Sequence, residues 1–489
     1  MEVARRKISS LFRENELVRI QGRVMRIFET RSTIIYTVFD ESGEIEVVSD
    51  YEAKRGEILD IEGKTRARGN VLQIYAINVK TLSGEEAERI DQEIEAALEK
   101  QSNPLHSEFL IKDRHMEEMS PDIERAARII RKAVFEMRPI LIRHHNDCDG
   151  ITGALLVKKA ISELMDKENF DQEAKKKLLY TNQNNSAIYE TIDALRDINI
   201  FRSIDSDGRP LIILIDFSSN SNSIDSLSLL RGANFEIILI DHHPPDADIG
   251  SYVDCFISTW ARSGDSNYPA GLLAGEVAKK IYKINADEIQ TLSLIGDKSR
   301  LIGAEKENKE LKKKALVLDF LGTYSKFPNT LEFYESVFYN QKIVDSLYKQ
   351  ATSKIEASKK IAMEYVKIKD LENGFKLCLA RLDRAVKKGE FPGKGKLTSE
   401  IHDEFKLKVD APLVTIGYGG SSINFRANRK AKENGFDANR LITNLRNELK
   451  NAIASGGGHD VAAGLKVNKG FGKIVLEEII KNIGEIKTK

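Results

Sequence analysis

The residues best suited to chemistry first appear at the end of one apolar segment, in the stretch PILIRHHNDCDG that begins at Pro139. His145, Asp147 and Asp149 follow residues 140–142 at two-residue spacing, and Gly150 closes the stretch. Imidazole and carboxylate groups are ligands for divalent metal ions. Taken alone this pattern is weak evidence, because Asp residues also cap helices after strands.

The same arrangement recurs three times downstream, which favours a metal site over helix capping. Asp216 follows the apolar residues 211–215, and Asp241, His242 and His243 follow residues 237–240. Asp297 follows residues 292–295 and a glycine. Four of the eight histidines lie at these ends. Ligands collect beyond the carboxyl ends of strands in open α/β sheets, so we predict four strands that bring these side chains together.

The elements around these residues predict a parallel α/β sheet. Apolar runs alternate with amphipathic helical patterns up to about residue 300, which is typical of right-handed βαβ crossovers. Ser120, Pro121 and Asp122 predict the start of the helix that precedes the first strand. Residues 303–365 are charged at helical spacing and predict a helical elaboration. Residues 371–489 predict a smaller α+β unit with a basic loop at 388–396.

The N-terminal part predicts a different fold. Residues 16–82 contain five short alternating segments, which favour an OB-type β-barrel that binds single strands. Its candidate phosphate and base contacts are Arg19, Arg23, Arg26, Lys64, Arg66, Arg68, Tyr36, Phe39 and Tyr75. The alternative is that the aromatic residues belong to the core and the cations are only solvated. Residues 84–103 have one apolar face and predict a helical connector.

Composition limits the possible binding modes and the possible location of the protein. The chain has 489 residues with 75 basic and 75 acidic side chains, so its net charge is zero, which argues against non-specific coating of nucleic acid. It has no apolar run long enough to span a membrane and no secretory core at the N-terminus. Three cysteines at unrelated spacings indicate a reducing compartment. We therefore expect a cytoplasmic protein without a membrane partner.

Together the motifs resemble a known family. HHNDCDG, LIDFSS, IDHHPP and the later Asp297 resemble the four motifs of the DHH phosphoesterases. The stretch SGGGH at 455–459, followed by AAG at 462–464, resembles the motif of the DHH-associated domain. These motifs cover roughly residues 135–489. With the barrel in front, the chain resembles the archaeal RecJ-like single-strand exonucleases, which include the GINS-associated nuclease group.

This resemblance implies four regions. They are an OB-fold nucleic-acid-binding module at 1–82, a helical connector at 83–120, a DHH catalytic domain at 121–365 with its helical elaboration from about 303, and a DHH-associated substrate-binding domain at 366–489.

The resemblance also implies two metal ions and assigns their ligands. His145, Asp147 and Asp216 would hold one ion. Asp149, Asp216, His242 and Asp297 would hold the other, so Asp216 would bridge the two. Asp241 would orient the histidine pair, and His243 would face the scissile phosphate. The mixed nitrogen and oxygen ligands favour Mn²⁺, with Mg²⁺ as the alternative.

The last unit would bind the substrate. Glycines let a backbone approach an anion closely, and a histidine and an arginine can clamp a phosphate. The residues implied are Asn424, Arg426, Gly456, Gly457, Gly458 and His459. Family members often carry Ser where this chain has Asn424. The alternative for a glycine-rich loop is a flexible turn.

These inferences predict a metal-dependent exonuclease that hydrolyses single-stranded nucleic acid in replication or repair, with DNA and 5′-3′ polarity favoured. One alternative is a 3′-5′ phosphodiesterase of RNA or short oligonucleotides. A second alternative is a scaffold without catalysis that binds the GINS complex. The presence of every ligand residue argues against the scaffold, although a catalytic protein that binds GINS stays open.

Overall fold

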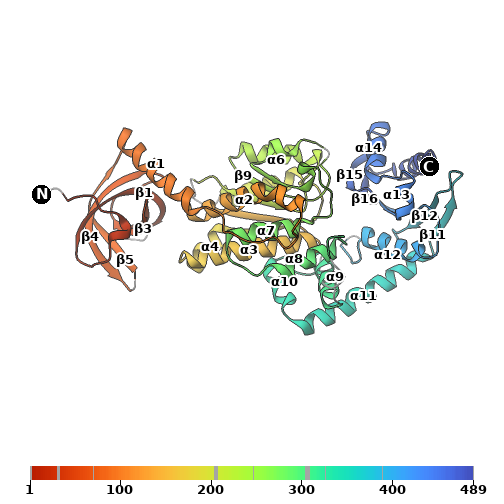
Figure 1. Cartoon of the computed structure of the whole chain (residues 1–489), viewed down its shortest axis with the longest axis horizontal. Helices are drawn as coiled ribbons and strands as arrows, with labels where there is room; N and C mark the ends of the chain where they lie inside the picture. Colours follow the sequence, from red (N-terminus) through yellow and green to blue (C-terminus); the bar gives the residue numbers. More distant parts are fainter. Residues whose placement is uncertain are drawn as a thin grey trace.

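Three folded units lie in a row in the computed structural model, and the two chain termini lie at opposite ends of the molecule (Figure 1). The structure describes residues 3–29, 33–69, 71–202, 208–245, 247–302, 309–324, 326–387 and 389–487. An N-terminal barrel comes first, a parallel sheet with its helices lies in the middle, and an α+β unit follows. The predicted fold class is therefore confirmed.

The N-terminal unit is a closed five-stranded barrel of OB type. Its strands are β1 (Leu17–Glu29), β2 (Ile34–Asp40), β3 (Gly43–Ser49), β4 (Ile58–Arg68) and β5 (Val71–Thr81), in the order β1-β2-β3-β5-β4. Gly22 allows β1 to bend across β2, because a Cβ there would lie 2.4 Å from the carbonyl oxygen of Phe39. Tyr36 and Phe39 are buried, so these two aromatic residues belong to the core and are not stacking surfaces.

Helix α1 (Gly84–Gln101) is packed against the barrel, so it is more than a connector. Its buried Ile90 and Ile94 join a core that also contains Phe39 of the barrel. Arg23 of β1 donates to Asp91 at 2.8 Å and to Glu95 at 2.7 Å. Arg23 is therefore committed to this helix and is not available for a phosphate.

Helix α2 (Arg114–Phe135) begins earlier than predicted. The Asp113 side chain caps it by accepting from the backbone N–H of Met116 at 3.0 Å. The start predicted at Ser120 is wrong, and Pro121 lies inside the helix. The reason is burial, since Met116 and Met119 continue the apolar stripe upstream of the proline.

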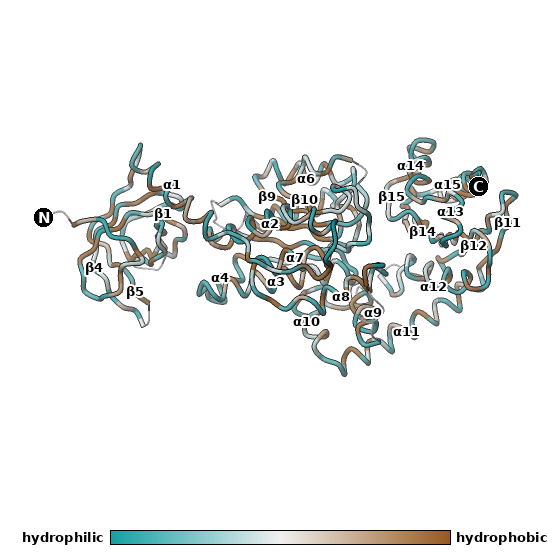
Figure 2. Tube along the Cα trace, viewed as in Figure 1, coloured by the Kyte–Doolittle hydropathy of each residue, from teal (hydrophilic) through white to brown (hydrophobic). Residues whose placement is uncertain are grey.

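The central sheet is parallel and has five strands. They are β6 (Ile140–His145), β7 (Leu179–Asn184), β8 (Leu211–Ile215), β9 (Glu236–Ile240) and β10 (Cys255–Ile257), in the order β10-β9-β8-β6-β7. The helices that accompany them are α3 (Cys148–Lys167), α4 (Gln172–Leu178), α5 (Thr191–Arg202), α6 (Ile224–Gly232), α7 (Ala270–Ile281) and α8 (Asp287–Gly296). The hydropathy colouring shows that the sheet and the helices against it form the apolar centre of this unit (Figure 2).

Three of the four predicted strands exist, and the fourth is wrong. Residues 292–295 belong to helix α8, and Asp297 is the residue at its C-terminal end. Leu292 and Leu294 are both buried in the core. A four-residue apolar run is equally compatible with a buried strand and a buried helix, which explains the error.

Three further helices connect the central unit to the last one. They are α9 (Lys309–Thr323), α10 (Leu331–Phe338) and α11 (Gln341–Met363). The long helix α11 runs along one side of the molecule toward the last unit (Figure 1). The predicted helical elaboration is thus formed by these three helices with short loops between them, and residues 303–308 and 325 lie outside the described residues.

The C-terminal unit has one six-stranded sheet. Its strands are β11 (Val366–Asp370), β12 (Lys376–Arg381), β13 (Leu413–Gly419), β14 (Ser422–Ala427), β15 (Ile453–His459) and β16 (Ala462–Val467), in the order β11-β12-β13-β14-β16-β15. Its helices are α12 (Lys394–Lys406), α13 (Arg429–Glu433), α14 (Ala438–Glu448) and α15 (Gly472–Gly484).

Two loop predictions in this unit are corrected. The glycines at 456–458 are part of strand β15, which pairs with β16 and lies at the edge of the sheet. Gly456 is needed for this pairing, since a Cβ there would lie 2.8 Å from the side chain of Leu465. The basic loop predicted at 388–396 ends at Gly393, where α12 begins with Lys394. Among the described residues, no helix is long and apolar enough to cross a membrane.

Candidate metal and phosphate site

The candidate site lies where the carboxyl ends of β6, β8 and β9 meet. These strands are neighbours in the sheet, so His145, Asp216 and His242 emerge side by side. The turn from β6 into α3 adds Asp147 and Asp149, and the end of α8 adds Asp297. The structure therefore brings together the six residues predicted as metal ligands.

One ligand group contains His145, Asp147 and Asp216, with one ligand atom of each within 4.8 Å of the others. His145 Nδ1 lies 2.7 Å from Asp147 Oδ2 and 3.4 Å from Asp216 Oδ2. The other oxygen of Asp147 accepts from the backbone N–H of Gly150 at 3.1 Å and caps helix α3. That cap fixes the carboxylate in place at the start of the helix.

A second group forms around His242. Its Nε2 lies 3.0 Å from Asp297 Oδ2, 3.4 Å from Asp216 Oδ1 and 3.7 Å from Asp149 Oδ2. Its Nδ1 is 3.1 Å from the backbone oxygen of Ser266, which leaves Nε2 as the nitrogen that can bind a cation. Asp216 thus presents one oxygen to each group.

Asp216 is the residue whose environment most clearly demands a cation. It is 1% exposed, and neither carboxylate oxygen accepts a hydrogen bond from the described residues. Its nearest charged neighbours are His145 Nδ1 and His242 Nε2, each 3.4 Å away, and a buried carboxylate without hydrogen bonds is strongly unfavourable unless cations compensate its charge. Its φ of 68° also places it in the left-handed region, where Asp and Asn are tolerated best. The donor set around Asp216 therefore fits divalent metal ions.

The neighbouring acids confirm the excess of negative charge. Burial and the nearby carboxylate of Asp216 raise the pKa of Asp149 well above its usual value. Burial, together with repulsion from Asp216 and Asp147, raises the pKa of Asp297 to about 6, although His242 opposes this. These carboxylates repel one another, and cations placed among them would relieve that repulsion.

Asp149 accepts hydrogen bonds from three donors that the sequence did not reveal. Its two oxygens accept from the backbone N–H groups of Ala270 and Gly271 at 2.7 and 2.8 Å, at the start of helix α7. The hydroxyl of Ser293 donates to it as well, at 2.5 Å. These three donors come from α7 and α8, more than a hundred residues away in sequence, and no spacing pattern points to them.

Asp241 holds one member of the histidine pair. Its Oδ1 accepts from the backbone N–H of His243 at 3.1 Å and lies 2.8 Å from His243 Nδ1. His242 takes its orientation from Ser266 instead, so the predicted orienting role of Asp241 applies directly to His243 alone. His144 is buried with Nδ1 against the backbone oxygen of His145, and burial lowers its pKa to about 4.

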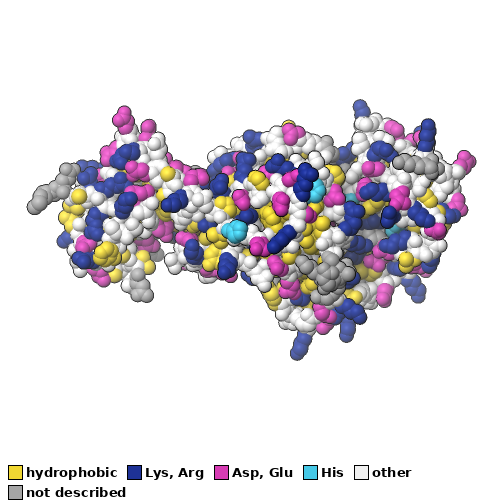
Figure 3. All heavy atoms as spheres, viewed as in Figure 1, with side chains coloured by type: hydrophobic (Ala, Val, Ile, Leu, Met, Phe, Trp, Pro, Cys, Tyr) yellow, Lys and Arg dark blue, Asp and Glu magenta, His cyan; other side chains and the backbone are white. Residues whose placement is uncertain are grey.

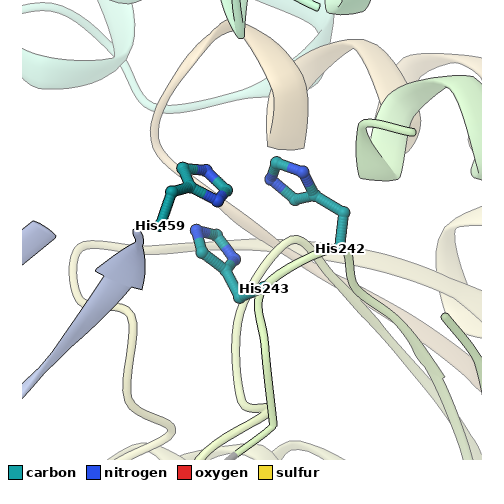
Figure 4. Close-up of side chains that lie close together, drawn as sticks. All are labelled: His242, His243 and His459. Carbon is teal, nitrogen blue, oxygen red and sulfur yellow. The ribbon is translucent and has the colours of Figure 1, made fainter. Parts of the chain in front are cut away.

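The C-terminal unit reaches the site through His459 at the end of β15. Its ring stacks on His243 with a centroid distance of 5.6 Å and an interplanar angle of 12°, and the centroid of His242 is 5.3 Å away. The three rings face one another across the boundary between the two units (Figure 4). His459 Nδ1 is buried and has no hydrogen-bond partner among the described residues, so this nitrogen is free for a ligand.

Arg426 and Asn424 lie behind His459 in the same sheet. Arg426 Nε donates to the hydroxyl of Ser399 at 2.7 Å, and burial lowers the pKa of Arg426 to about 10. The side-chain nitrogen of Asn424 is buried and unpartnered within the described part of the chain. Gly395 of α12 is close to both, since a Cβ there would lie 3.5 Å from Asn424 Oδ1 and 3.8 Å from Arg426 Nη2. Arg426 Nη2 also donates to the backbone oxygen of Gly395 at 3.4 Å.

A support from helix α9 was also missed. Asp319 accepts from the backbone N–H of Cys148, between Asp147 and Asp149, at 2.9 Å. Its other oxygen is 3.5 Å from Lys396 Nζ of the C-terminal unit. A cavity of about 430 Å³ opens here, and it is lined by Ile295, Gly296, Lys298, Ser299, Lys312, Ala315, Leu316, Asp319 and Lys396. Helix α9 thus holds the metal-ligand turn and meets the last unit.

Replacing Asp319 with Ala is expected to weaken Mn²⁺ binding about 10- to 100-fold, because groups that orient metal ligands contribute this much. The Cys148 N–H would lose its acceptor, and the turn that carries Asp147 and Asp149 would loosen. Titration calorimetry with Mn²⁺ measures the effect. Glu310→Ala, on the half-exposed start of α9, is the control. Equal affinities for both variants would show that Asp319 does not position the ligands.

Comparison with known proteins identifies a family and a fold that this chain shares. The DHH family, N-terminal domain, matches residues 139–296. An uncharacterized protein of Methanocaldococcus jannaschii is 30% identical and aligns with 97% of this chain and 70% of its own length. A solved structure described as the DHH domain of a member of a family of ribosomal proteins is 29% identical, has a TM-score of 0.76, and covers 83% of this chain and 100% of its own.

RecJ of Thermus thermophilus, solved in complex with Mn²⁺, is 13% identical with a TM-score of 0.50. That match covers 81% of this chain and 59% of RecJ. At 13% identity, this similarity shows a shared fold alone.

Proposed function

The chain belongs to the DHH family of phosphoesterases, and from this premise we propose that it hydrolyses phosphodiester bonds of single-stranded nucleic acid with two divalent metal ions. The observation that carries the proposal is Asp216, which presents one unpartnered oxygen to each of two ligand groups. A bridging carboxylate between two ions is the usual arrangement in enzymes that displace a phosphodiester oxygen in line.

In this proposal the ligand residues divide as the family resemblance implies. His145, Asp147 and Asp216 hold one ion in this proposal. Asp149, His242 and Asp297, with the second oxygen of Asp216, hold the other. The bound ions would activate a water molecule and neutralise charge on the phosphate. Two imidazole nitrogens in the set favour Mn²⁺ over Mg²⁺.

The residues around the ions would bind and orient the substrate. His243 is held by Asp241 and stacked on His459, so a phosphate that contacts both rings would lie between the central and C-terminal units. Asn424 and Arg426 would receive the terminal phosphate beside Gly395. The N–H groups of Gly456, Gly457 and Gly458 belong to an edge strand, where groups that do not pair with β16 remain available to an anion.

A site shared by two units favours single strands. The scissile bond would have to reach β9 and β15 at once, which a flexible strand can do. A duplex is far wider than its major groove of about 12 Å, and it should be excluded. Further features of the proposal follow the resemblance to archaeal RecJ-like nucleases: DNA over RNA, 5′-3′ polarity, a role in replication or repair, and GINS as a partner. End-labelled DNA and RNA strands incubated with Mn²⁺ would test substrate and polarity in one assay.

The barrel offers a small surface for the incoming strand. Arg66 of β4 lies over the ring of Tyr75 of β5, 4.8 Å from its centroid, and Lys64 is paired with Tyr75 in the sheet. Lys64, Arg66 and Arg68 are exposed. Arg19 is excluded from this role, because it donates to Asp60 at 2.6 Å. Acidic and basic side chains are interspersed over the face of the molecule in Figure 3, so local features must guide the strand in place of a broad basic field.

A double variant, Arg66→Ala with Tyr75→Ala, is expected to weaken binding of a long single strand about tenfold or more, because base stacking is worth about 1–3 kcal/mol per base. Dinucleotides cannot reach both the barrel and the metal site, so their hydrolysis should not change. Lys80→Ala, an exposed cation elsewhere on β5, is the control. Fluorescence anisotropy with strands of increasing length provides the measurement. If the double variant keeps the wild-type dependence on length, the barrel does not capture the strand.

A further inference from the structure

Trp260 is the single tryptophan of the chain, and it lies at the functional edge of the sheet. It belongs to a short 3-10 helix, η4 (Thr259–Arg262), that follows β10. Strand β10 is parallel to β9, with Ile257 opposite Ile240, so η4 emerges beside the turn that carries His242. The tryptophan was not among the residues that the sequence motifs singled out.

The indole ring is fixed directly against a metal-ligand residue. Its Nε1 donates to the backbone oxygen of His242 at 3.0 Å and lies 3.1 Å from the hydroxyl oxygen of Ser266. The backbone oxygen of Ser266 in turn contacts His242 Nδ1 at 3.1 Å. One serine therefore connects the orientation of the indole to the orientation of the imidazole.

The turn that carries Trp260 is itself well anchored. Thr259 is buried and its hydroxyl donates to the backbone oxygen of Asp265. Gly264 N–H donates to the backbone oxygen of Thr259 at 2.8 Å, and a Cβ at Gly264 would lie 2.7 Å from Thr259 Cβ. The ring is thus held on a rigid support, which lowers the entropy that binding of a ligand to it would cost.

Despite these anchors, 38% of Trp260 remains exposed. Single exposed apolar residues are ordinary on protein surfaces. This one differs because one anchor is the backbone of His242, a proposed metal ligand, and the other is Ser266, which orients that ligand. The arginines of this region are already paired, Arg262 with Asp122 and Arg300 with Asp265, so the ring itself must provide the contact. An exposed flat ring on a rigid support suits a nucleobase, which stacks on such a face.

We propose that Trp260 is the stacking platform for the nucleobase next to the scissile phosphate. The proposal rests on the proposed function and adds a base-binding subsite to it. Stacking tolerates every base, because each has a π face, so the subsite would secure a nucleotide without selecting sequence. It would also make the enzyme distinguish a nucleotide from a bare sugar phosphate.

The single tryptophan makes the platform directly observable. Deoxynucleoside 5′-monophosphates are titrated into the full chain with Mn²⁺, and the fluorescence of Trp260 is followed. Stacking should quench the emission in a saturable manner. Deoxyribose 5-phosphate, which lacks a base, should compete for the site without quenching. If the nucleotide inhibits hydrolysis but leaves the emission unchanged, the base does not stack on Trp260.

Two substitutions separate stacking from a structural role. Trp260→Ala should raise KM for a normal strand about tenfold and leave KM for a strand with an abasic terminal nucleotide unchanged. Trp260→Phe keeps a stacking face but loses the N–H donor to His242, so it should retain most of the wild-type KM. Tyr339→Ala, at an exposed aromatic residue of the helical elaboration, is the control and should behave as wild type.

The outcomes distinguish this inference from the proposed function. If the wild-type chain hydrolyses no single strand, the proposed function fails whatever Trp260 does. If the wild type is active and Trp260→Ala raises KM equally for normal and abasic strands, only the platform is wrong. If Trp260→Phe is as impaired as Trp260→Ala, the residue acts by holding His242 and stacking is again excluded.

Discussion

Asp216→Asn is expected to lower the rate of strand hydrolysis at least about a thousandfold, which corresponds to about 4 kcal/mol of transition-state stabilisation. The amide can offer only one neutral oxygen, so it cannot bridge two ligand groups that each require a carboxylate oxygen. Rates of degradation of an end-labelled strand with saturating Mn²⁺ provide the measurement. Asp225→Asn makes the same chemical change on the exposed side of α6 and should keep the wild-type rate.

The same substitution should not destabilise the metal-free fold. Asp216 is buried without a hydrogen-bond donor, and its charge repels Asp149 and Asp297 but attracts the imidazoles of His145 and His242, each 3.4 Å away, so loss of the charge removes opposing contributions. Asparagine also tolerates the left-handed backbone at this position. The melting temperature in a chelator should therefore stay close to that of the wild type. A marked drop would mean that the carboxylate has a structural partner and that the loss of activity reflects unfolding.

His459→Ala is expected to lower kcat/KM about a hundredfold while the bound metal stays at the wild-type level. The ring comes from β15 and stacks on His243, so it contacts the place where a phosphate would lie, and it is a member of neither proposed ligand set. Loss of one preorganised group that stabilises charge in the transition state costs about 10²–10³ in rate. Kinetics on a labelled strand and metal analysis of the same preparation test both parts.

The control for this substitution is His106→Ala, at an exposed histidine of the segment before α2. One result of the metal analysis would contradict this prediction. His242, His243 and His459 present ligand nitrogens within 4.8 Å of one another. If His459→Ala removes one equivalent of metal, this histidine is a ligand, and the assignment of the C-terminal unit to substrate alone is wrong.

Much of the central unit could be predicted from the sequence, because each of β6, β8 and β9 is a short apolar run that ends at a ligand-type residue. Asp297 is predicted as a ligand on a strand, and it reaches the same place from the end of helix α8. The residue type and its position after an apolar run were informative. The sequence did not indicate the element type, because four buried apolar residues are compatible with a strand and with a helix.

The supports of the site could not be predicted, because they come from segments remote in sequence. Asp319 holds the N–H of Cys148, and Ser266 holds His242, yet neither belongs to a motif. Gly456 is a strand residue only because β16 lies against it, a contact that no local pattern reveals. Arg23 is likewise a plausible phosphate contact in the sequence, and only its pairing with α1 excludes that role.

The most direct test of the central claim is a crystal structure of the full chain soaked in Mn²⁺, with anomalous scattering measured at the manganese edge. We expect two peaks about 3.5–4 Å apart, one on each side of Asp216. One peak should be bound by His145 and Asp147, and the other by Asp149, His242 and Asp297. A single peak, or a peak held by His242, His243 and His459, would contradict the account.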